Sequence, residues 1–271
     1  MPSRAHPIAI LTDFGYRDHY VGVMKGVIAT IAPDAPIIDL THGIPPQSIV
    51  AGAIALRESW RFFPRRTVFL VVVDPGVGTP RLPIAIESRA GARFVGPDNG
   101  VLWMAAGAAG VSRMVRLEAR RYRLPETSST FHGRDIFAPA AAFLARGTPL
   151  RALGPAIERI AQWSLPEPQE GRDQVGGEVI YIDGYGNLIT NLTRASLAPL
   201  LDSFHGKQVS VRIKKSAPLR IFSTYGDAPL DAGRATFGSF ELLEIAVRNG
   251  SAAQRFGCKV GDRVVARVMR S

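Results

Sequence analysis

The stretch TVFLVVVDPGVG, from Thr67 to Gly78, decides the fold class. Its apolar run is rich in β-branched residues and ends at Asp74, in a turn that contains proline and glycine. A continuous run of this kind is typical of a central strand that is buried on both faces of a sheet. The stretch therefore predicts an α/β fold, in which helices cover both faces of a mainly parallel sheet.

The segments on either side of this strand alternate between strand-length and helix-length patterns, as expected for such a sheet. Strands are expected in IAILTDFG (8–15), PIIDLTHG (36–43), LPIAIES (82–88) and ARFVG (92–96). Helices are expected in YVGVMKGVIATIAP (20–33), SIVAGAIALRESWRFFP (48–64) and GRDIFAPAAAFLARG (133–147). Ser48 is the expected N-cap of the second helix.

The last third of the chain has a different pattern. Short apolar segments recur there without helix-length spacers, which predicts a small antiparallel β-barrel or sandwich. The Pro-rich, charged stretch SLPEPQEG (164–171) separates the two patterns. We therefore expect an N-terminal α/β domain over residues 1–158, a linker over 159–175 and a C-terminal β-barrel domain over 176–271.

Composition limits the class of protein. Of the 271 residues, 46% are hydrophobic and 21% are charged, which excludes collagen-like, disordered and coiled-coil chains. The single cysteine, Cys258, allows no intrachain disulfide and suits a reducing cytoplasm. We expect neither a secretory signal nor a membrane span, because no apolar run approaches the necessary length.

The chain is strongly basic, with 33 Lys and Arg against 23 Asp and Glu and a formal net charge of +10. Its basic residues are scattered, and no basic motif is interleaved with aromatic residues. Net charge alone indicates solubility and non-specific contacts rather than a specific partner. The pattern therefore disfavours nucleic acid as the partner.

Polar residues gather where the predicted strands end, at the edge where α/β sheets bind ligands. They are Asp13, Asp39, His42, Asp74, His132 and Asp135. From spacing alone, a metal-dependent hydrolase could use Asp13, Asp39, His42, Asp74 and His132 as a ligand cage, although no HxH or HExxH pair is present. A nucleotide-binding module without catalysis is a second alternative, although the Gly-Val-Gly at 76–78 matches neither GxGxxG nor a P-loop.

Several segments together resemble one family, the S-adenosyl-L-methionine hydroxide adenosyltransferases, which are related to the fluorinase and the chlorinase. The resemblance covers nearly the whole chain in order. The segments are TDFG (12–15), YVGVMKG (20–26), THGIPPQ (41–47), VDPGVGTPR (73–81), GPDNGVL (96–102), FHGRDIFAPAAA (131–142), IDGYGNLITN (182–191) and SFELLEIAVRNGSAA (239–253).

The resemblance implies hydrolysis of S-adenosyl-L-methionine to adenosine and L-methionine, with hydroxide derived from water attacking the ribose C5′. It implies Asp74, Arg81 and His132 as the residues that position the hydroxide. Because this trio contains a cationic arginine where a metal site would have another neutral or anionic ligand, we expect no metal or other cofactor. It also implies an N-terminal α/β domain, a C-terminal β-barrel and a homotrimer with active sites between subunits.

The substrate contacts implied by the resemblance are Asp13 on the ribose diol, Asp74 beside the nucleophile, and Asn187, Ser239, Glu244 and Val247 on the adenosine. Tyr185 is expected to stack on the adenine. The halogenating relatives carry tyrosine where Asp74 stands. Because a carboxylate would repel a halide, hydrolysis is favoured over a SAM halogenase activity.

Overall fold

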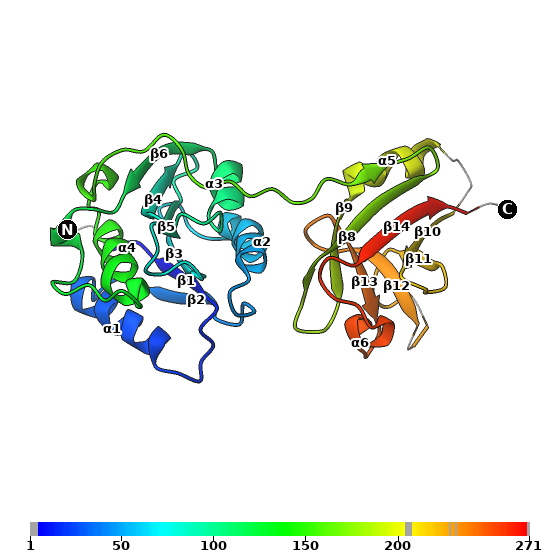
Figure 1. Ribbon diagram of the computed structural model, residues 1–271, viewed down its shortest axis with the longest axis horizontal. Coiled ribbons are helices and arrows are strands. Elements are labelled where there is room, and N and C mark those ends of the chain that lie inside the picture. The colour runs from blue at the N-terminus through cyan, green and yellow to red at the C-terminus, as the bar shows by residue number, and fades with distance from the viewer. Residues whose placement is uncertain (1–4, 204–207, 228, 231, 270–271) are drawn as a thin grey trace. The chain divides into compact units, whose positions relative to one another are not determined.

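The computed structural model describes residues 5–203, 208–227, 229–230 and 232–269, which form two compact units. The first unit runs to Ser164 and the second begins at Leu165 (Figure 1). Each unit has its own hydrophobic core. None of the described helices combines the length and the apolar character needed to cross a membrane.

The first unit is built on a six-stranded sheet with the order β2-β1-β3-β5-β4-β6. The pairs β1–β2, β1–β3 and β3–β5 are parallel, and β4 pairs antiparallel with β5 and β6. The strands are β1 (Ile8–Thr12), β2 (Ile37–Thr41), β3 (Val68–Val72), β4 (Pro83–Ser88), β5 (Arg93–Pro97) and β6 (Val111–Arg116). The expected mainly parallel sheet is confirmed, with β3 buried along its whole length.

Helices cover both faces of this sheet, as expected. One face packs on α1 (Tyr20–Ile31) and α4 (Ala138–Ala145), with Met24 and Leu144 in the shared core. The other face packs on α2 (Ile49–Ser59) and α3 (Trp103–Ala109). A Cβ at Gly52 of α2 would meet Val73 and Val101 at 3.1 Å, so this helix lies very close to the sheet.

Local signals explain where several helices begin. Ser48 caps α2, since its hydroxyl accepts a hydrogen bond from Ala51 N at 3.4 Å. The helix expected over 133–147 is divided into a π-helical turn, η3 (Gly133–Phe137), followed by α4. Pro139 lies in the first turn of α4, where a missing backbone N–H costs little. Helix α3 and strand β6 were not expected from the sequence.

The second unit is a closed seven-stranded barrel with the order β14-β10-β11-β12-β13-β9-β8, closed by the pairing of β14 with β8. Its strands are β8 (Gln174–Ile182), β9 (Leu188–Thr193), β10 (Val209–Ile213), β11 (Leu219–Phe222), β12 (Gly233–Phe237), β13 (Leu242–Val247) and β14 (Arg263–Val268). The two-residue strand β7 (Gln169–Glu170) extends β8. The expected β-barrel is confirmed, and β7 together with the start of β8 occupies part of the expected linker.

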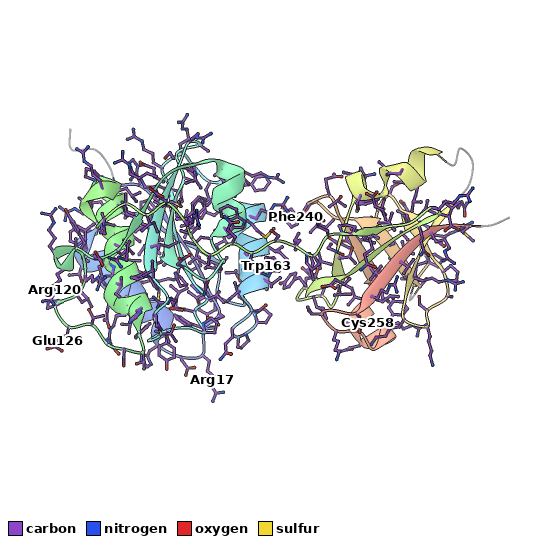
Figure 2. All side chains as sticks on the ribbon, turned by 45° about the horizontal axis from the view of Figure 1, so that its top comes forward. Arg17, Arg120, Glu126, Trp163, Phe240 and Cys258 are labelled. Atoms are coloured by element: carbon purple, nitrogen blue, oxygen red, sulfur yellow. The ribbon has the colours of Figure 1, made fainter. Side chains whose placement is uncertain are left out.

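The barrel differs from the expectation in three respects. Strand β12 and helix α5 (Arg194–Ser203) were not foreseen. Strands β11 and β12 pair in parallel, so the barrel is not wholly antiparallel. A tight hairpin turn cannot join a parallel pair, and the longer connection between Phe222 and Gly233 allows this pairing. Helix α6 (Ala252–Phe256) follows β13, and the side chain of Cys258 is buried just after it (Figure 2).

Candidate active site

A buried ion pair lies at the carboxyl end of β3. Arg81 Nε donates to Asp74 Oδ1 at 2.9 Å, and Arg81 Nη2 contacts Asp74 Oδ2. Arg81 Nη2 also lies 2.7 Å from His132 Nδ1. Both charged side chains are more than nine-tenths buried, with 8% of Arg81 and 5% of Asp74 exposed. The structure thus brings the three expected catalytic residues into direct contact.

Two tight turns after Asp74 bring the side chain of Arg81 back to the Asp74 carboxylate. Backbone hydrogen bonds from Val77 N to Asp74 O and from Thr79 N to Gly76 O form two successive turns. Gly78 has φ +78°, and a Cβ there would lie 2.8 Å from Ser129 O. Only glycine allows both that backbone conformation and that close approach. This turn therefore needs the glycine that the sequence provides.

His132 reaches the same place from a distant part of the chain. It directly precedes η3, and a Cβ at Gly133 would meet Met24 Sδ at 3.2 Å and Val72 Cγ1 at 3.5 Å. The glycine therefore allows η3 to approach the end of β3 closely. Single π-helical turns within helices occur frequently at functional sites.

Burial and nearby positive charge lower the pKa of His132 below its ordinary value. Burial is the largest effect, and the positive charge of Arg81 is the next, while Asp74 opposes both. The imidazole is therefore neutral at neutral pH. In that form, Nδ1 accepts a hydrogen bond from Arg81, and Nε2 carries the proton. The ring presents Nε2–H as a hydrogen-bond donor.

Asp13 follows β1, the strand next to β3 in the sheet. It is half-buried, and its Oδ2 accepts a hydrogen bond from Gln47 N at 2.7 Å. Because β1 and β3 are parallel, Asp13 and Asp74 leave the sheet at the same edge. The rim expected from the sequence therefore contains Asp13 together with the three residues in contact.

The residues of the alternative metal cage do not converge. Asp39 pairs with Lys25 at 2.7 Å, and His42 Nε2 lies 3.2 Å from Asp39 Oδ1. Asp135, which the sequence also assigned to this rim, is fully buried. Its carboxylate accepts hydrogen bonds from Arg134 Nε and from Ser128 N. Among the residues that the structure describes, no three His, Cys, Asp or Glu side chains are grouped for metal binding. Asp39, His42 and Asp135 are paired with other groups of the protein instead.

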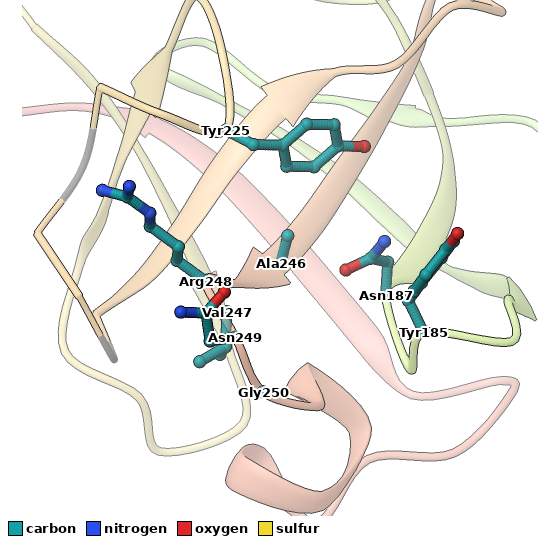
Figure 3. Close-up of a pocket in the computed structure, with 8 residues that line it drawn as sticks. All are labelled: Tyr185, Asn187, Tyr225, Ala246, Val247, Arg248, Asn249 and Gly250. Atoms are coloured by element: carbon teal, nitrogen blue, oxygen red, sulfur yellow. The ribbon is translucent and has the colours of Figure 1, made fainter.

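A cavity of about 480 Å³ lies in the second unit (Figure 3). Asn187, Val247 and Tyr185 line it. These three are among the substrate contacts that the resemblance implies, and that role stays a prediction. Tyr185 is 84% exposed, and Asn187 Nδ2 donates to Asp183 Oδ2 at 2.9 Å. Asp183 also accepts from the backbone N–H groups of residues 185 and 187, which shapes this turn.

Glu244 and Ser239 are placed differently from these three residues. The Glu244 side chain is buried, and burial raises the pKa of its carboxyl group above the ordinary value. It accepts a hydrogen bond from the Tyr225 hydroxyl rather than lining the cavity itself. Ser239 is exposed in the turn between β12 and β13. The structure therefore does not place these two residues on the cavity wall.

Tyr225 lines the cavity, and the sequence analysis missed it. It lies in the connection from β11 to β12, a segment that carries no recognisable sequence motif. Its hydroxyl group contacts Glu244, and burial together with this carboxylate raises the pKa of Tyr225. The nearest sequence signal is the aromatic residue directly before a glycine in STYGD (223–227).

The chain combines two units. The first is an α/β unit with an ion pair at one edge of its sheet, and the second is a closed β-barrel with a cavity, an arrangement that indicates a two-domain enzyme. The family model described as the SAM hydroxide adenosyltransferase N-terminal domain matches residues 8–154, and the C-terminal domain model matches residues 177–265. The chain belongs to the SAM hydroxide adenosyltransferase family. The family expected from the sequence is thus confirmed.

Named relatives and a solved structure agree with this assignment. The (R)-S-adenosyl-L-methionine hydrolase of Thermus thermophilus is 41% identical, over 94% of this chain and 97% of that protein. The Salinispora tropica protein of the same name is 38% identical, over 95% and 96%. A fluorinase from Actinoplanes is 29% identical, over 73% and 75%. The crystal structure of an uncharacterized conserved protein from Thermotoga maritima has a TM-score of 0.88 and 38% identity, over 96% and 99%.

Proposed function

We propose that this chain is a hydrolase that converts S-adenosyl-L-methionine to adenosine and L-methionine. The observation that supports it most is the contact of Arg81 with both Asp74 and His132. It puts an anion, a cation and a neutral imidazole around one point, as the delivery of a water-derived nucleophile requires. Two curated relatives at 38–41% identity, named (R)-S-adenosyl-L-methionine hydrolases, support the same substrate.

The proposed reaction exchanges one bond at C5′ for another. The oxygen of a water molecule forms a bond to C5′, the C5′–S bond breaks, and its electron pair stays on sulfur. Methionine leaves as a neutral thioether, and the second water proton is released to solvent. Because the sulfonium is a good leaving group, the demanding part is to align the oxygen in line with the C–S bond.

Each member of the trio has a distinct proposed role. Asp74 accepts hydrogen bonds from the water, using the lone pairs that Arg81 leaves free. Arg81 stabilises the negative charge that develops as the water loses a proton. His132 donates its Nε2–H to the oxygen, which keeps one lone pair directed at C5′. The trio therefore acts mainly by positioning the nucleophile.

The substrate contacts follow the resemblance and stay proposals. Asp13 accepts the hydroxyl groups of the ribose diol, since its Oδ1 has no protein partner among the described residues. Asn187 and the backbone of Val247 contact the adenosine, and Tyr185 stacks on the adenine. Ser239 and Glu244 are the remaining proposed adenosine contacts, and Glu244 would act through Tyr225, which lines the cavity and donates its hydroxyl group to Glu244.

An adenosine assay in water enriched in heavy oxygen tests the proposal. The expected products are adenosine that carries one label in its 5′-hydroxyl group and methionine that carries none. Unlabelled adenosine, or adenine or methylthioadenosine as the main product, would contradict attack at C5′. Separate assays of the R and S sulfonium epimers test whether this chain shares the preference that the relatives' names state.

The alternative activities have outcomes of their own. Exhaustive chelation should leave turnover unchanged, because Arg81 occupies the place where a metal site would have a neutral or anionic ligand. Loss on chelation and recovery with a divalent ion would favour a metal-dependent hydrolase. A halide-dependent product would indicate a halogenase, and tight binding without turnover would indicate a non-catalytic SAM-binding module.

We also propose that the chain acts as a homotrimer with active sites between subunits. The proposed residues support this, because Asp13, Asp74, Arg81 and His132 belong to the first unit, whereas Asn187, Ser239 and Glu244 belong to the second. Mixed oligomers of Asp74→Ala and Asn187→Ala chains should regain activity, since some sites receive an intact half from each chain. No recovery in proven mixed oligomers would indicate sites within one chain.

A further inference from the structure

His42 is the centre of a series of polar contacts, from Thr12 to Asp39, that the proposed reaction does not use. It follows β2, and its side chain is completely buried. Nδ1 lies 2.8 Å from Thr12 Oγ1, and Nε2 lies 3.2 Å from Asp39 Oδ1. Both ring nitrogens therefore face a specific polar atom, one on β1 and one on β2 itself.

The donor and the acceptor of each contact around His42 can be assigned. Burial alone would raise the pKa of Asp39, but contacts from Lys25, His42 and Tyr16 outweigh it and lower that pKa. Asp39 is therefore an ionised acceptor, and the His42 ring directs its N–H from Nε2 to it. Nδ1 is then an acceptor, so the Thr12 hydroxyl group donates to it.

Because the Thr12 hydroxyl group donates its proton to His42, its oxygen can accept a hydrogen bond from the turn that contains Asp13. Phe14 N donates to Thr12 Oγ1 at 3.2 Å, which forms a side-chain turn around Asp13. Gly15 N donates to His42 O at 2.8 Å, so the same histidine also holds the far side of the turn. The backbone of Asp13 is fixed from both sides.

The same turn is tied to the proposed ribose contact. Asp13 Oδ2 accepts from Gln47 N, and Gln47 lies five residues after His42 with φ +64°, a conformation uncommon outside glycine. The connections that follow β1 and β2 thus hold each other through His42 at one point and Asp13 at another.

We propose that His42 is a positioning residue that acts through Thr12 to orient the Asp13 carboxylate toward the ribose diol of the substrate. The proposal rests on the proposed function, since it takes the ribose role of Asp13 from there. Loose orientation of a charged acceptor weakens binding, because the ligand must then order the turn as it binds. Packing alone would not require both ring nitrogens to be matched.

Two substitutions of His42 test the roles of its two ring nitrogens separately. The amide of asparagine occupies the place of Nδ1, whereas the amide of glutamine reaches the place of Nε2. His42→Asn can therefore still accept from Thr12, and His42→Gln cannot. Calorimetric titration of the full chain with adenosine should show a Kd raised about 10-fold in His42→Gln, equivalent to about 1.4 kcal/mol, and by less than about threefold in His42→Asn.

Thr12→Val provides a second approach if a histidine variant does not fold. Valine keeps the shape of threonine and removes the hydroxyl group, so adenosine binding should weaken as in His42→Gln. Thr30→Val is the matched control, because the Thr30 hydroxyl donates only to Gly26 O within α1. It should leave the Kd unchanged.

Two further titrations distinguish positioning from a general loss of structure. With 2′,3′-dideoxyadenosine, which has no diol, wild-type and His42→Gln proteins should bind equally. In an Asp13→Asn background, His42→Gln should add almost nothing, because both substitutions act on one contact. A structural defect would weaken both ligands and add to the effect of Asp13→Asn.

The outcomes also separate this proposal from the proposed function. Wild-type protein that binds adenosine, with His42→Gln and Thr12→Val binding it equally well, would overturn the positioning role alone. An equal loss for both ligands would also overturn it. Wild-type protein that neither binds adenosine nor turns over S-adenosyl-L-methionine would instead contradict the proposed function.

Discussion

Two clusters at one edge of the first sheet use the same kinds of side chain in different ways. Asp74, Arg81 and His132 meet just after β3, whereas Asp39, which lies in β2, contacts both Lys25 of α1 and His42, which follows β2. In the β3 cluster, the described residues offer Arg81 Nη1 no partner, and the His132 ring keeps Nε2–H as a donor. In the β2 cluster, both ring nitrogens of the histidine lie near a polar atom of the protein, Nδ1 at 2.8 Å from Thr12 Oγ1 and Nε2 at 3.2 Å from Asp39 Oδ1.

The difference shows that residue type alone does not identify a catalytic cluster. The polar groups of the β2 cluster contact neighbouring segments of the protein, which suits a positioning role. The β3 cluster contains polar groups, such as Arg81 Nη1, that have no partner among the described residues, which suits contact with a reacting water. Substitutions in the two clusters should therefore divide their effects differently between turnover and binding.

The largest effect is expected for Asp74→Asn. The change keeps size and removes the charge that orients the water, so kcat should fall about 100- to 1000-fold while KM changes little. Asp39→Asn should show the opposite division, a higher KM with kcat nearly retained. Exposed Asp34→Asn is the control. Steady-state assays that gave both clusters the same division would remove the distinction between them.

A smaller effect is expected for Arg81→Lys. Lysine keeps the charge but cannot contact both oxygens of Asp74 and the ring of His132 together. We expect a loss of kcat of about 10- to 100-fold, equivalent to about 1.4–2.7 kcal/mol. Arg151→Lys, at an exposed position, should behave as wild type. Unchanged kcat in Arg81→Lys would show that charge suffices and geometry does not matter.

A third prediction concerns acid stability and His132. Because its folded pKa is lowered by burial and by Arg81, the unfolded chain binds the proton more readily. The stability contributed by the neutral ring is therefore complete above about pH 6.5 and is lost as the pH falls through that value toward the folded pKa. Thermal unfolding from pH 8 to 5 should show a steeper loss in wild type than in His132→Asn. Equal slopes would contradict a lowered pKa.

The smallest effect on turnover is expected for Ser48→Ala. The substitution removes the N-cap of α2 just after the Gln47 contact to Asp13, and caps of this kind contribute about 0.5–2 kcal/mol. The midpoint of urea unfolding should fall, while kcat stays within about twofold. Ser59→Ala, at the other end of α2, removes no cap and should lower the midpoint less. A large loss of kcat would mean that the β2 connection takes part in turnover.

Local patterns predicted most of the first unit because they report what a segment needs on its own. The β-branched run before Asp74 predicts a buried strand, and Ser48 predicts the start of a helix. Parallel strands end at one edge, so the rim residues also follow from the pattern. In the barrel, α5 and β12 were missed. Strand β12 is short and two of its three buried residues, Arg234 and Thr236, are polar, so it carries no apolar pattern, and its parallel pairing with β11 depends on tertiary packing.

The sequence by itself determined the fold class, the rim of polar residues and the family. Only the tertiary structure decided that Arg81 pairs with Asp74 and also reaches His132, that Asp39 and His42 pair with other groups of the protein instead of forming a metal cage, and that Tyr225 lines the barrel cavity. The physical reason is distance. Strand and helix signals act within a few residues, whereas a hydrogen bond requires two atoms at about 3 Å, and that depends on how segments far apart in the chain pack together.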